Sequence, residues 1–148
     1  MLYFAYGSNI SSLRLSARIG PVGVRGLAQL PYHEHRFSKS GFDGTGKGNI
    51  QPHTTRRVHG VLYELTSAQL EILCNYEGGY RRATLETLAL STQAPSVAIT
   101  FIGERPGGAP APSQAYLDHY REGFAEHGFP VEYARAILAD GGDPRPFG

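Results

Sequence analysis

The stretch that most constrains the fold is residues 2–9, Leu2-Tyr3-Phe4-Ala5-Tyr6-Gly7-Ser8-Asn9. Its first five residues are aromatic or apolar, which predicts a short buried strand, and the Gly-Ser-Asn that follows predicts a tight turn. Loops that directly follow a rigid strand are common places for binding and catalytic groups. We therefore expect a functional loop at residues 7–9.

The rest of the chain fits a single turn-rich domain. It has 148 residues, about one domain's worth, and its 14 Lys+Arg and 13 Asp+Glu leave a net charge of +1. This balance provides no basic field for a nucleic acid or an anionic membrane, so neither is an expected partner. The 19 glycines and 10 prolines are more than usual but fewer than the roughly 25–30% that signals disorder. We expect one domain over residues 1–140 and a flexible tail over residues 141–148.

Cysteine content and hydropathy indicate where such a protein works. Cys74 is the single cysteine, which excludes an internal disulfide and a four-cysteine metal site. The first residues lack the basic segment and long apolar core of a signal peptide, and charged residues interrupt every long apolar run. A soluble cytoplasmic protein is the expectation.

Local signals place the first half of the secondary structure. Ser11 or Ser12 can cap a short helix that ends at Gly20-Pro21. The segment from Val24 to Phe37 should be extended, with a bulge or an edge at Gly26 and Pro31. Residues 41–48 are expected to form a glycine-dense loop, and Arg57 to Leu65 alternates like a well-buried strand.

The second half begins with a capping box. Thr66-Ser67-Ala68-Gln69 has the form in which a Thr hydroxyl and a Gln amide satisfy free backbone groups at a helix start. That helix should end at Gly78-Gly79. A hairpin is predicted from Tyr80 to Ile102, and two further helices should begin near Ser113 and Pro130.

Four other candidate sites have weak support in the sequence. Residues 41–48 approach the phosphate-loop pattern but lack its final hydroxyl, and the extended Asn49-Ile50-Gln51-Pro52 follows where a helix should begin. His33 and His35 are at most half of a zinc site, so no metal is expected. Ser8 lies outside the elbow motif of serine hydrolases, and Cys74 falls on an apolar helix stripe, where a packing role is expected.

Glu77 is the best catalytic candidate that residue chemistry offers. It directly follows the helix that starts at Ser67, and Tyr76 and Tyr80 can shield it from water. A partly desolvated carboxylate near the negative end of a helix dipole has a raised pKa. Such a group suits a general base near neutral pH, whereas the alternative is an ordinary solvated Glu at a helix end.

Four blocks of sequence resemble the gamma-glutamylcyclotransferase family, also called AIG2-like. They occur in the family's order and span residues 3 to about 138: Tyr3 to Asn9, His59 to Leu65, Leu73 to Arg82, and Pro112 to Tyr133. The resemblance implies an α+β fold in which a mixed, barrel-like sheet is flanked by short helices. It also implies an enzyme that needs no cofactor and converts gamma-glutamyl amines or amino acids to 5-oxoproline, with release of the amine.

The resemblance also assigns residues. Glu77 matches the catalytic glutamate; Tyr6, Gly7, Ser8 and Asn9 match the loop that cradles the glutamyl group; Tyr80 and Tyr116 match tyrosines of the cavity. The expected partner is thus a small gamma-glutamyl molecule, and a homodimer is possible. Two alternatives stay open: a non-catalytic module that binds a small ligand or partner, and a cyclotransferase that acts on a carrier-bound gamma-glutamyl group.

Overall fold

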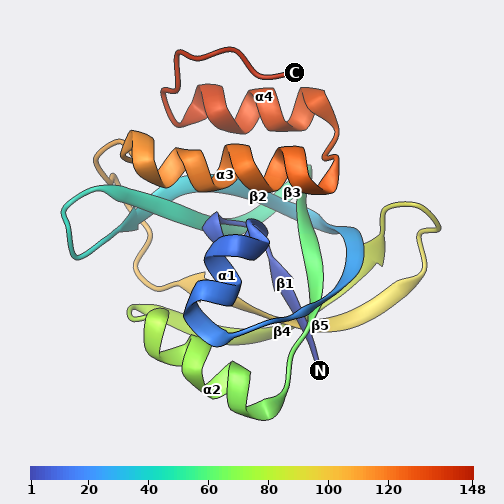
Figure 1. Cartoon of the computed structure of the whole chain (residues 1–148). Helices are drawn as coiled ribbons and strands as arrows, with labels where there is room; N and C mark the ends of the chain where they lie inside the picture. Colours follow the sequence, from blue (N-terminus) through green and yellow to red (C-terminus); the bar gives the residue numbers. More distant parts are fainter.

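The computed structural model describes residues 1–148 as a five-stranded barrel with helices packed on its outside (Figure 1). In chain order the elements are β1 (Leu2–Ala5), the 3₁₀ helix η1 (Ser8–Ile10), α1 (Ser12–Ile19), β2 (Gly23–Ser40), β3 (Gly46–Glu64), α2 (Ser67–Tyr76), β4 (Tyr80–Ala89), β5 (Pro95–Gly103), α3 (Gln114–His127) and α4 (Val131–Asp140). The expected α+β class with a mixed, barrel-like sheet is confirmed.

The barrel closes in the order β1-β3-β2-β4-β5. All neighbouring strands are antiparallel except β1 and β5, which pair in parallel where Tyr3 lies opposite Ile99. In Figure 1, α3 and α4 cover one side of the barrel, and α2 lies on the opposite side. Because β1 ends at Ala5, the loop that follows it begins at one end of the barrel.

The helix boundaries follow the capping signals in the sequence. The Ser11 hydroxyl accepts a hydrogen bond from the Arg14 amide, and Ser113 does the same for Tyr116. Thr66 and Gln69 form the complete capping box at the start of α2. Gly128 ends α3 with a φ of 65°, in the left-handed region that glycine adopts without strain.

The β2–β3 hairpin is much longer than the sequence indicated. We expected β3 to begin near Arg57, whereas it begins at Gly46, inside the segment expected to be a loop. Bulges occur between Val24 and Gly26 and between Pro31 and His33, as predicted. The extra length depends on contacts with α3 and with the 104–113 segment, for example from the Gly46 amide to the Ala111 carbonyl, and local propensity does not encode such contacts.

Apolar side chains form two clusters. The smaller one consists of Tyr6 and of residues from the strands, which include Phe4, Leu30 and Leu62. The larger one joins the other face of β1 to the helices, and Tyr63 and Tyr120 in it are completely buried. Cys74 is half-buried and packs against this cluster. Successive side chains of β1 point to opposite faces of the sheet, so this strand contributes residues to both clusters.

Residues 141–148 form no helix or strand, but they do contact α3. Asp143 accepts hydrogen bonds from Arg121 and Arg145, and Phe147 packs against Phe124 with ring centroids 5.9 Å apart. The flexibility expected of this tail stays a prediction, which hydrogen exchange of its amides would measure. None of the helices combines the length and apolar character needed to span a membrane.

Candidate active site

One cavity of about 330 Å³ opens at the rim of the barrel. This volume falls within the range of pockets that hold small molecules. Every residue predicted for the site lines it: Tyr6, Gly7, Ser8, Asn9, Glu77, Tyr80 and Tyr116. The residues of this set lie up to 110 positions apart in the chain, and the fold brings all of them to one place.

Glu77 reaches the cavity because it ends α2. Its amide bonds to the Cys74 carbonyl as the helix stops, and its own carbonyl accepts from the Tyr80 amide, which leads directly into β4. Burial raises the pKa of the Glu77 carboxyl above its ordinary value, while the charges of Arg18 and Arg14 and a hydrogen bond from Asn9 partly oppose this. The carboxylate is thus a stronger base than an exposed one.

Asn9 connects Glu77 to the loop after β1. Its Nδ2 donates to Glu77 Oε1 at 3.3 Å and to the Tyr3 hydroxyl at 3.1 Å, and its Oδ1 accepts from Arg18 at 3.3 Å. The guanidinium of Arg18 also lies over the ring of Tyr76, 5.0 Å from its centroid. Asn9 is almost completely buried, so these bonds hold it in one orientation.

Two tyrosines hold the first part of β3 at the opposite wall. The Gly48 amide donates to the Tyr116 hydroxyl at 2.9 Å, and the Tyr80 hydroxyl donates to the Gly48 carbonyl at 2.7 Å. Tyr6, at the end of β1, donates its hydroxyl hydrogen bond to the carbonyl of Phe101. The tyrosines therefore shape the cavity through backbone contacts as well as through their rings.

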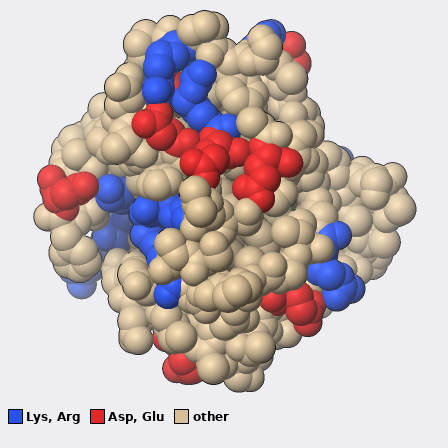
Figure 2. Space-filling view, viewed as in Figure 1, with Lys and Arg blue, Asp and Glu red and all other residues tan.

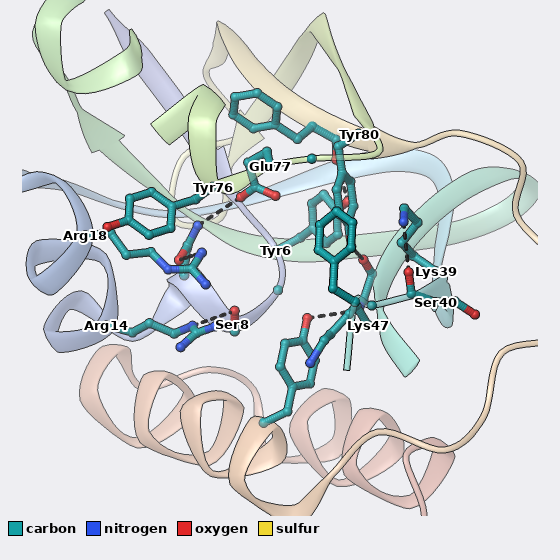
Figure 3. Close-up of a pocket in the computed structure, with 18 of the residues that line it drawn as sticks. Tyr6, Ser8, Arg14, Arg18, Lys39, Ser40, Lys47, Tyr76, Glu77 and Tyr80 are labelled. Carbon is teal, nitrogen blue, oxygen red and sulfur yellow. Dashed lines mark hydrogen bonds between the residues drawn. The ribbon is translucent and has the colours of Figure 1, made fainter. Parts of the chain in front are cut away.

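Four basic side chains that were not predicted from the sequence also line the cavity. Arg14 and Arg18 come from α1, and Lys39 and Lys47 from the β2–β3 hairpin. Figure 3 shows these two pairs on opposite sides of Glu77 and Tyr6. Figure 2 shows basic side chains gathered around a hollow on this face. The four-residue spacing of Arg14 and Arg18, which puts both on one helix face, was the available signal.

Most of this positive charge lacks an acidic partner. Lys47 pairs with Asp43 at 3.1 Å. The hydrogen bonds of the other three side chains go to groups that are not acidic. Arg14 bonds to Ser8 Oγ and His119 Nε2, Arg18 to Asn9 Oδ1, and Lys39 to the Ser40 carbonyl. A cavity with four basic and two acidic side chains favours an anionic ligand.

Acidic residues of α3 set the position of α1. Glu122 accepts from the Ser11 hydroxyl at 2.7 Å, and Glu126 accepts from the Ser12 amide at 3.0 Å and from the Ser12 hydroxyl. Negative charge at a helix N-terminus also complements the helix dipole. These contacts fix the helix that carries Arg14 and Arg18.

The structure also shows where the glycine-rich segment and the two histidines of the sequence analysis lie. After the turn at residues 42–45 the chain continues as β3, so no helix follows the glycine-rich segment, although its Lys47 and Gly48 line the cavity. His33 bonds to the Pro31 carbonyl, and His35 is buried against Tyr120. No group of three or more His, Cys, Asp or Glu side chains is arranged to hold a metal ion.

The architecture is that of known cyclotransferase structures. A solved structure of a gamma-glutamyl cyclotransferase matches 94% of this chain and 86% of its own, with a TM-score of 0.87 and 23% identity. An uncharacterised human protein matches 93% of this chain and 86% of its own, with a TM-score of 0.86 and 24% identity. An AIG2-like protein from Mus musculus matches 78% and 81%, with a TM-score of 0.53 and 16% identity.

The chain therefore has the gamma-glutamylcyclotransferase-like fold, and the resemblance seen in its motifs is confirmed at the level of the fold. No family model matches the sequence. No curated protein matches it either.

Proposed function

We propose that this protein is a gamma-glutamylcyclotransferase-like enzyme, which cyclises a gamma-glutamyl amine or amino acid to 5-oxoproline and releases the free amine. The observation that carries the proposal is Glu77, a largely desolvated carboxylate with a raised pKa that faces the same cavity as the Tyr6-Gly7-Ser8-Asn9 loop. The fold shared with a gamma-glutamyl cyclotransferase supports the assignment. No metal or cofactor enters the proposed reaction.

The reaction needs a base but no protein nucleophile. The α-amine of the substrate attacks its own γ-carbonyl carbon, and the new C–N bond closes a five-membered ring. Glu77 takes a proton from the attacking amine and then gives one to the departing nitrogen as the original amide C–N bond breaks. General acid–base catalysis of this kind contributes typically 10²–10⁴-fold to the rate.

The loop after β1 and the helix α1 hold the glutamyl part in this proposal. The amides of Ser8 and Asn9 begin η1 and have no acceptor within that short helix. They are the donors for the substrate carboxylate or for the oxyanion on the γ-carbonyl. Arg14 and Arg18 add positive charge on the same side (Figure 3), and a folded substrate chain brings amine and carbonyl together.

The second pair of basic residues favours one kind of leaving group. Lys39 and Lys47 lie across Glu77 from the arginines (Figure 3), where the departing part of the substrate would extend. An amino acid or peptide with a carboxylate complements these charges, whereas a cationic amine is repelled. Among the alternatives left by the sequence, gamma-glutamyl amino acids are therefore preferred over gamma-glutamyl amines and carrier-bound groups.

A panel of gamma-glutamyl compounds tests the proposal. The purified protein should release 5-oxoproline, detected by mass, and should turn over substrates with acidic leaving groups faster than those with cationic ones. Glu77→Gln keeps the shape of the side chain but removes the base, so we expect kcat to fall by about 10²–10⁴-fold.

Glu71→Gln is the matched control because Glu71 lies on the same helix, exposed to solvent, and it should leave kcat unchanged. Full activity of Glu77→Gln would rule out the mechanism. Binding of the panel without any turnover by the parent protein would favour the non-catalytic module instead.

A further inference from the structure

A histidine of α3 lies directly behind one of the basic side chains of the cavity. His119 Nε2 is 3.1 Å from Arg14 Nη1. Arg14 lines the cavity, whereas His119 does not. The two residues are 105 positions apart in the chain, and they meet because α1 is bonded to α3 through Ser12 and Glu126. The proposed reaction gives His119 no part.

The chemistry of the guanidinium fixes the direction of this hydrogen bond. Arginine is only a donor, and it keeps its charge throughout the physiological range of pH. His119 Nε2 must therefore accept, and an imidazole nitrogen accepts only when it carries no hydrogen. The ring is thus neutral, with its single hydrogen on Nδ1. Since His119 is half-exposed, water can accept that hydrogen.

The guanidinium of Arg14 is held at two of its three nitrogens. Nε donates to Ser8 Oγ at 2.9 Å, which ties the side chain to the loop after β1 (Figure 3), and Nη1 donates to His119. Because the group is planar and rigid, two fixed nitrogens set its orientation. The third nitrogen, Nη2, has no acceptor in the protein and keeps both hydrogens for a ligand. A carboxylate is the kind of ligand that such charged donors bind strongly.

Protonation of His119 would remove this support from Arg14. A hydrogen on Nε2 leaves no lone pair to accept from the guanidinium. The imidazolium would also place a second positive charge 3.1 Å from Arg14 Nη1, and like charges at such a distance repel. The orientation of Arg14 therefore depends on the neutral form of His119.

The surroundings of His119 favour that neutral form. The nearby charged residues belong to α1, α3 and the tail, and they are Arg14, Arg18, Asp118, Glu122 and Arg145, the last of which pairs with Asp118. Burial lowers the pKa of His119 below its ordinary value of 6.5, and the two arginines of α1 add to this, whereas the two acids of α3 oppose it. The ring is therefore neutral at pH 8 and becomes charged only in acid.

We propose that His119 is a positioning residue, which holds the guanidinium of Arg14 at the cavity so that it binds the carboxylate of the substrate. This inference deepens the proposed function and rests on it for the identity of the anion. It does not rest on that function for the contact between His119 and Arg14. Protonation of His119 should weaken the binding of the anion, although the protonated ring adds positive charge.

The contact can be tested without any ligand. Long-range ¹H–¹⁵N spectra of the ¹⁵N-labelled parent protein distinguish the two neutral tautomers of a histidine, and His119→Gln assigns the resonance. We expect a hydrogen on Nδ1 and none on Nε2 at pH 8. A hydrogen on Nε2 at that pH would overturn the proposal because this nitrogen could not accept from Arg14.

Calorimetric binding of 5-oxoproline, which carries a carboxylate, tests the effect on the site. At pH 8, His119→Leu should raise the dissociation constant by about 3- to 10-fold, the worth of one hydrogen bond. His119→Gln keeps an acceptor oxygen and should bind as tightly as the parent. His33→Leu is the control, since His33 bonds to the Pro31 carbonyl of its own strand. Unchanged binding by His119→Leu would overturn the proposal.

The pH dependence of binding separates positioning from packing. The spectra also give the pKa of His119, and as the pH falls through it the parent should lose affinity relative to His119→Gln, whose amide does not titrate. Glu77 ionises in both proteins, so its effect cancels in the comparison. Equal or tighter binding by the parent in acid would overturn the proposal, since the neutral ring would then give Arg14 no support.

A double mutant tests whether His119 acts through Arg14. In the Arg14→Gln background, His119→Leu should cause no further loss of affinity, and an equal loss in both backgrounds would overturn the proposal. During turnover, His119→Leu should raise KM for 5-oxoproline formation and leave kcat near that of the parent. A parent protein with the Nδ1 tautomer that neither binds nor forms 5-oxoproline would refute the proposed function and leave the contact with Arg14 intact.

Discussion

Glu77 is subject to two opposing effects on its pKa. Burial raises the pKa of the carboxyl, and the positive charges of Arg18 and Arg14 restrain that rise. If Glu77 is the base, kcat/KM should increase as the pH rises through the pKa of Glu77 in the free enzyme. The acid limb of the profile should therefore lie above the ordinary value of 4.5.

Replacing Arg18 should move that acid limb to higher pH. Arg18→Gln removes the charge that most strongly favours the ionised form of Glu77, so the pKa rises further. The measurement is kcat/KM for 5-oxoproline release from pH 4 to 9. Arg25→Gln is the control, since Arg25 is exposed and pairs with Glu64. A limb that stays in place would show that Glu77 is not the titrating base.

The two arginines of the cavity differ from Glu77 in how far the sequence reveals them. The helix end and the flanking tyrosines made Glu77 a candidate from the sequence, and the family resemblance predicted its catalytic role. Arg14 and Arg18 were not among the predicted site residues, because nothing local places their helix beside residue 77. Asn9 does so in the folded chain by bonding to both Arg18 and Glu77.

Helix α3 depends on a glycine at its closest contact with η1. A Cβ on Gly123 would collide with the side chain of Ile10, and it would lie 2.7 Å from the Ile10 carbonyl carbon and 2.8 Å from the Ser11 nitrogen. Because the last two atoms belong to the backbone, they cannot move aside as a side-chain tip does. The close contact between α3 and the loop that begins the candidate site is therefore possible only because residue 123 has no side chain.

Gly123→Ala should destabilise the protein. Overpacking a core contact costs about 1–3 kcal/mol, which offsets or exceeds the roughly 1 kcal/mol that Ala gains over Gly inside a helix. Urea unfolding should show a lower free energy of unfolding than in the parent. Gly107→Ala is the control, since a Cβ there meets no atom within 4 Å. A more stable Gly123→Ala protein would contradict this description of the contact.

The elements themselves were predictable to different degrees. The capping box of α2, the caps of α1 and α3 and the β4–β5 hairpin depend on residues a few positions apart, so they were predicted well. The outer part of the β2–β3 hairpin was missed because Gly46 and Gly48 are poor strand residues. They pair in β3 with neighbours that include the carbonyl of Ala111 and the hydroxyls of Tyr80 and Tyr116.

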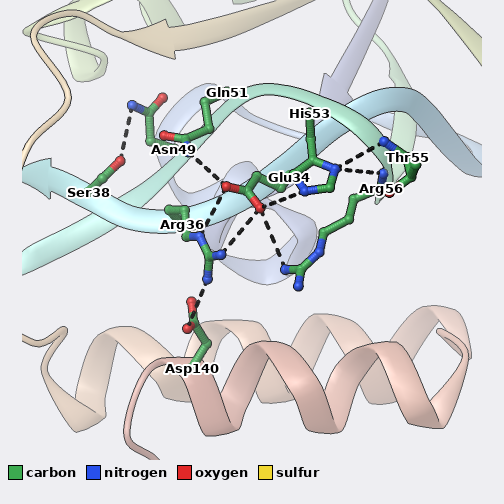
Figure 4. A network of polar contacts seen from close by, with 9 residues as sticks. All are labelled: Glu34, Arg36, Ser38, Asn49, Gln51, His53, Thr55, Arg56 and Asp140. Atoms are coloured by element: carbon green, nitrogen blue, oxygen red, sulfur yellow. Dashed lines mark hydrogen bonds and ion pairs between the residues drawn. The ribbon is translucent and has the colours of Figure 1, made fainter.

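The β2–β3 hairpin is tied to α4 by a network around the buried carboxylate of Glu34 (Figure 4). Gln51 donates to Glu34 at 2.8 Å, Arg36 donates at 3.2 and 3.3 Å, and Arg56 lies 3.5 Å away. Arg36 also bonds to Asp140 of α4 at 3.3 Å. Burial tends to raise the pKa of Glu34, but the bonds from Gln51 and Arg36 outweigh it, and the pKa lies below its ordinary value.

Glu34→Gln should lower the free energy of unfolding at pH 7 by about 1–3 kcal/mol, the worth of hydrogen bonds to a charged group. A carboxyl whose pKa is lowered by folding contributes stability above its unfolded pKa and loses it as the pH falls through the folded value. The difference from the parent should therefore disappear in that acidic window. Glu86→Gln, an exposed residue of β4, is the control. A difference independent of pH would contradict an electrostatic origin.

Several properties of the whole molecule stay predictions. Light scattering would test for a homodimer by measuring the molar mass of the protein in solution. The cytoplasmic location would be tested by imaging the protein in cells. The absence of a nucleic-acid partner rests on the near-neutral charge of the chain and is tested by a binding assay at low salt.

The resemblance in four blocks of sequence predicted which loop and acid belong to the candidate site. Local chemistry in the chain determined where helices start and stop and which strands alternate. Those features depend on neighbours within a few residues, and so they can be read before the chain folds. Closure of the barrel, the parallel contact of β1 with β5 and the four basic residues around Glu77 depend on partners tens of residues apart. Only tertiary packing brings such partners together, because no local signal specifies which distant surfaces will meet.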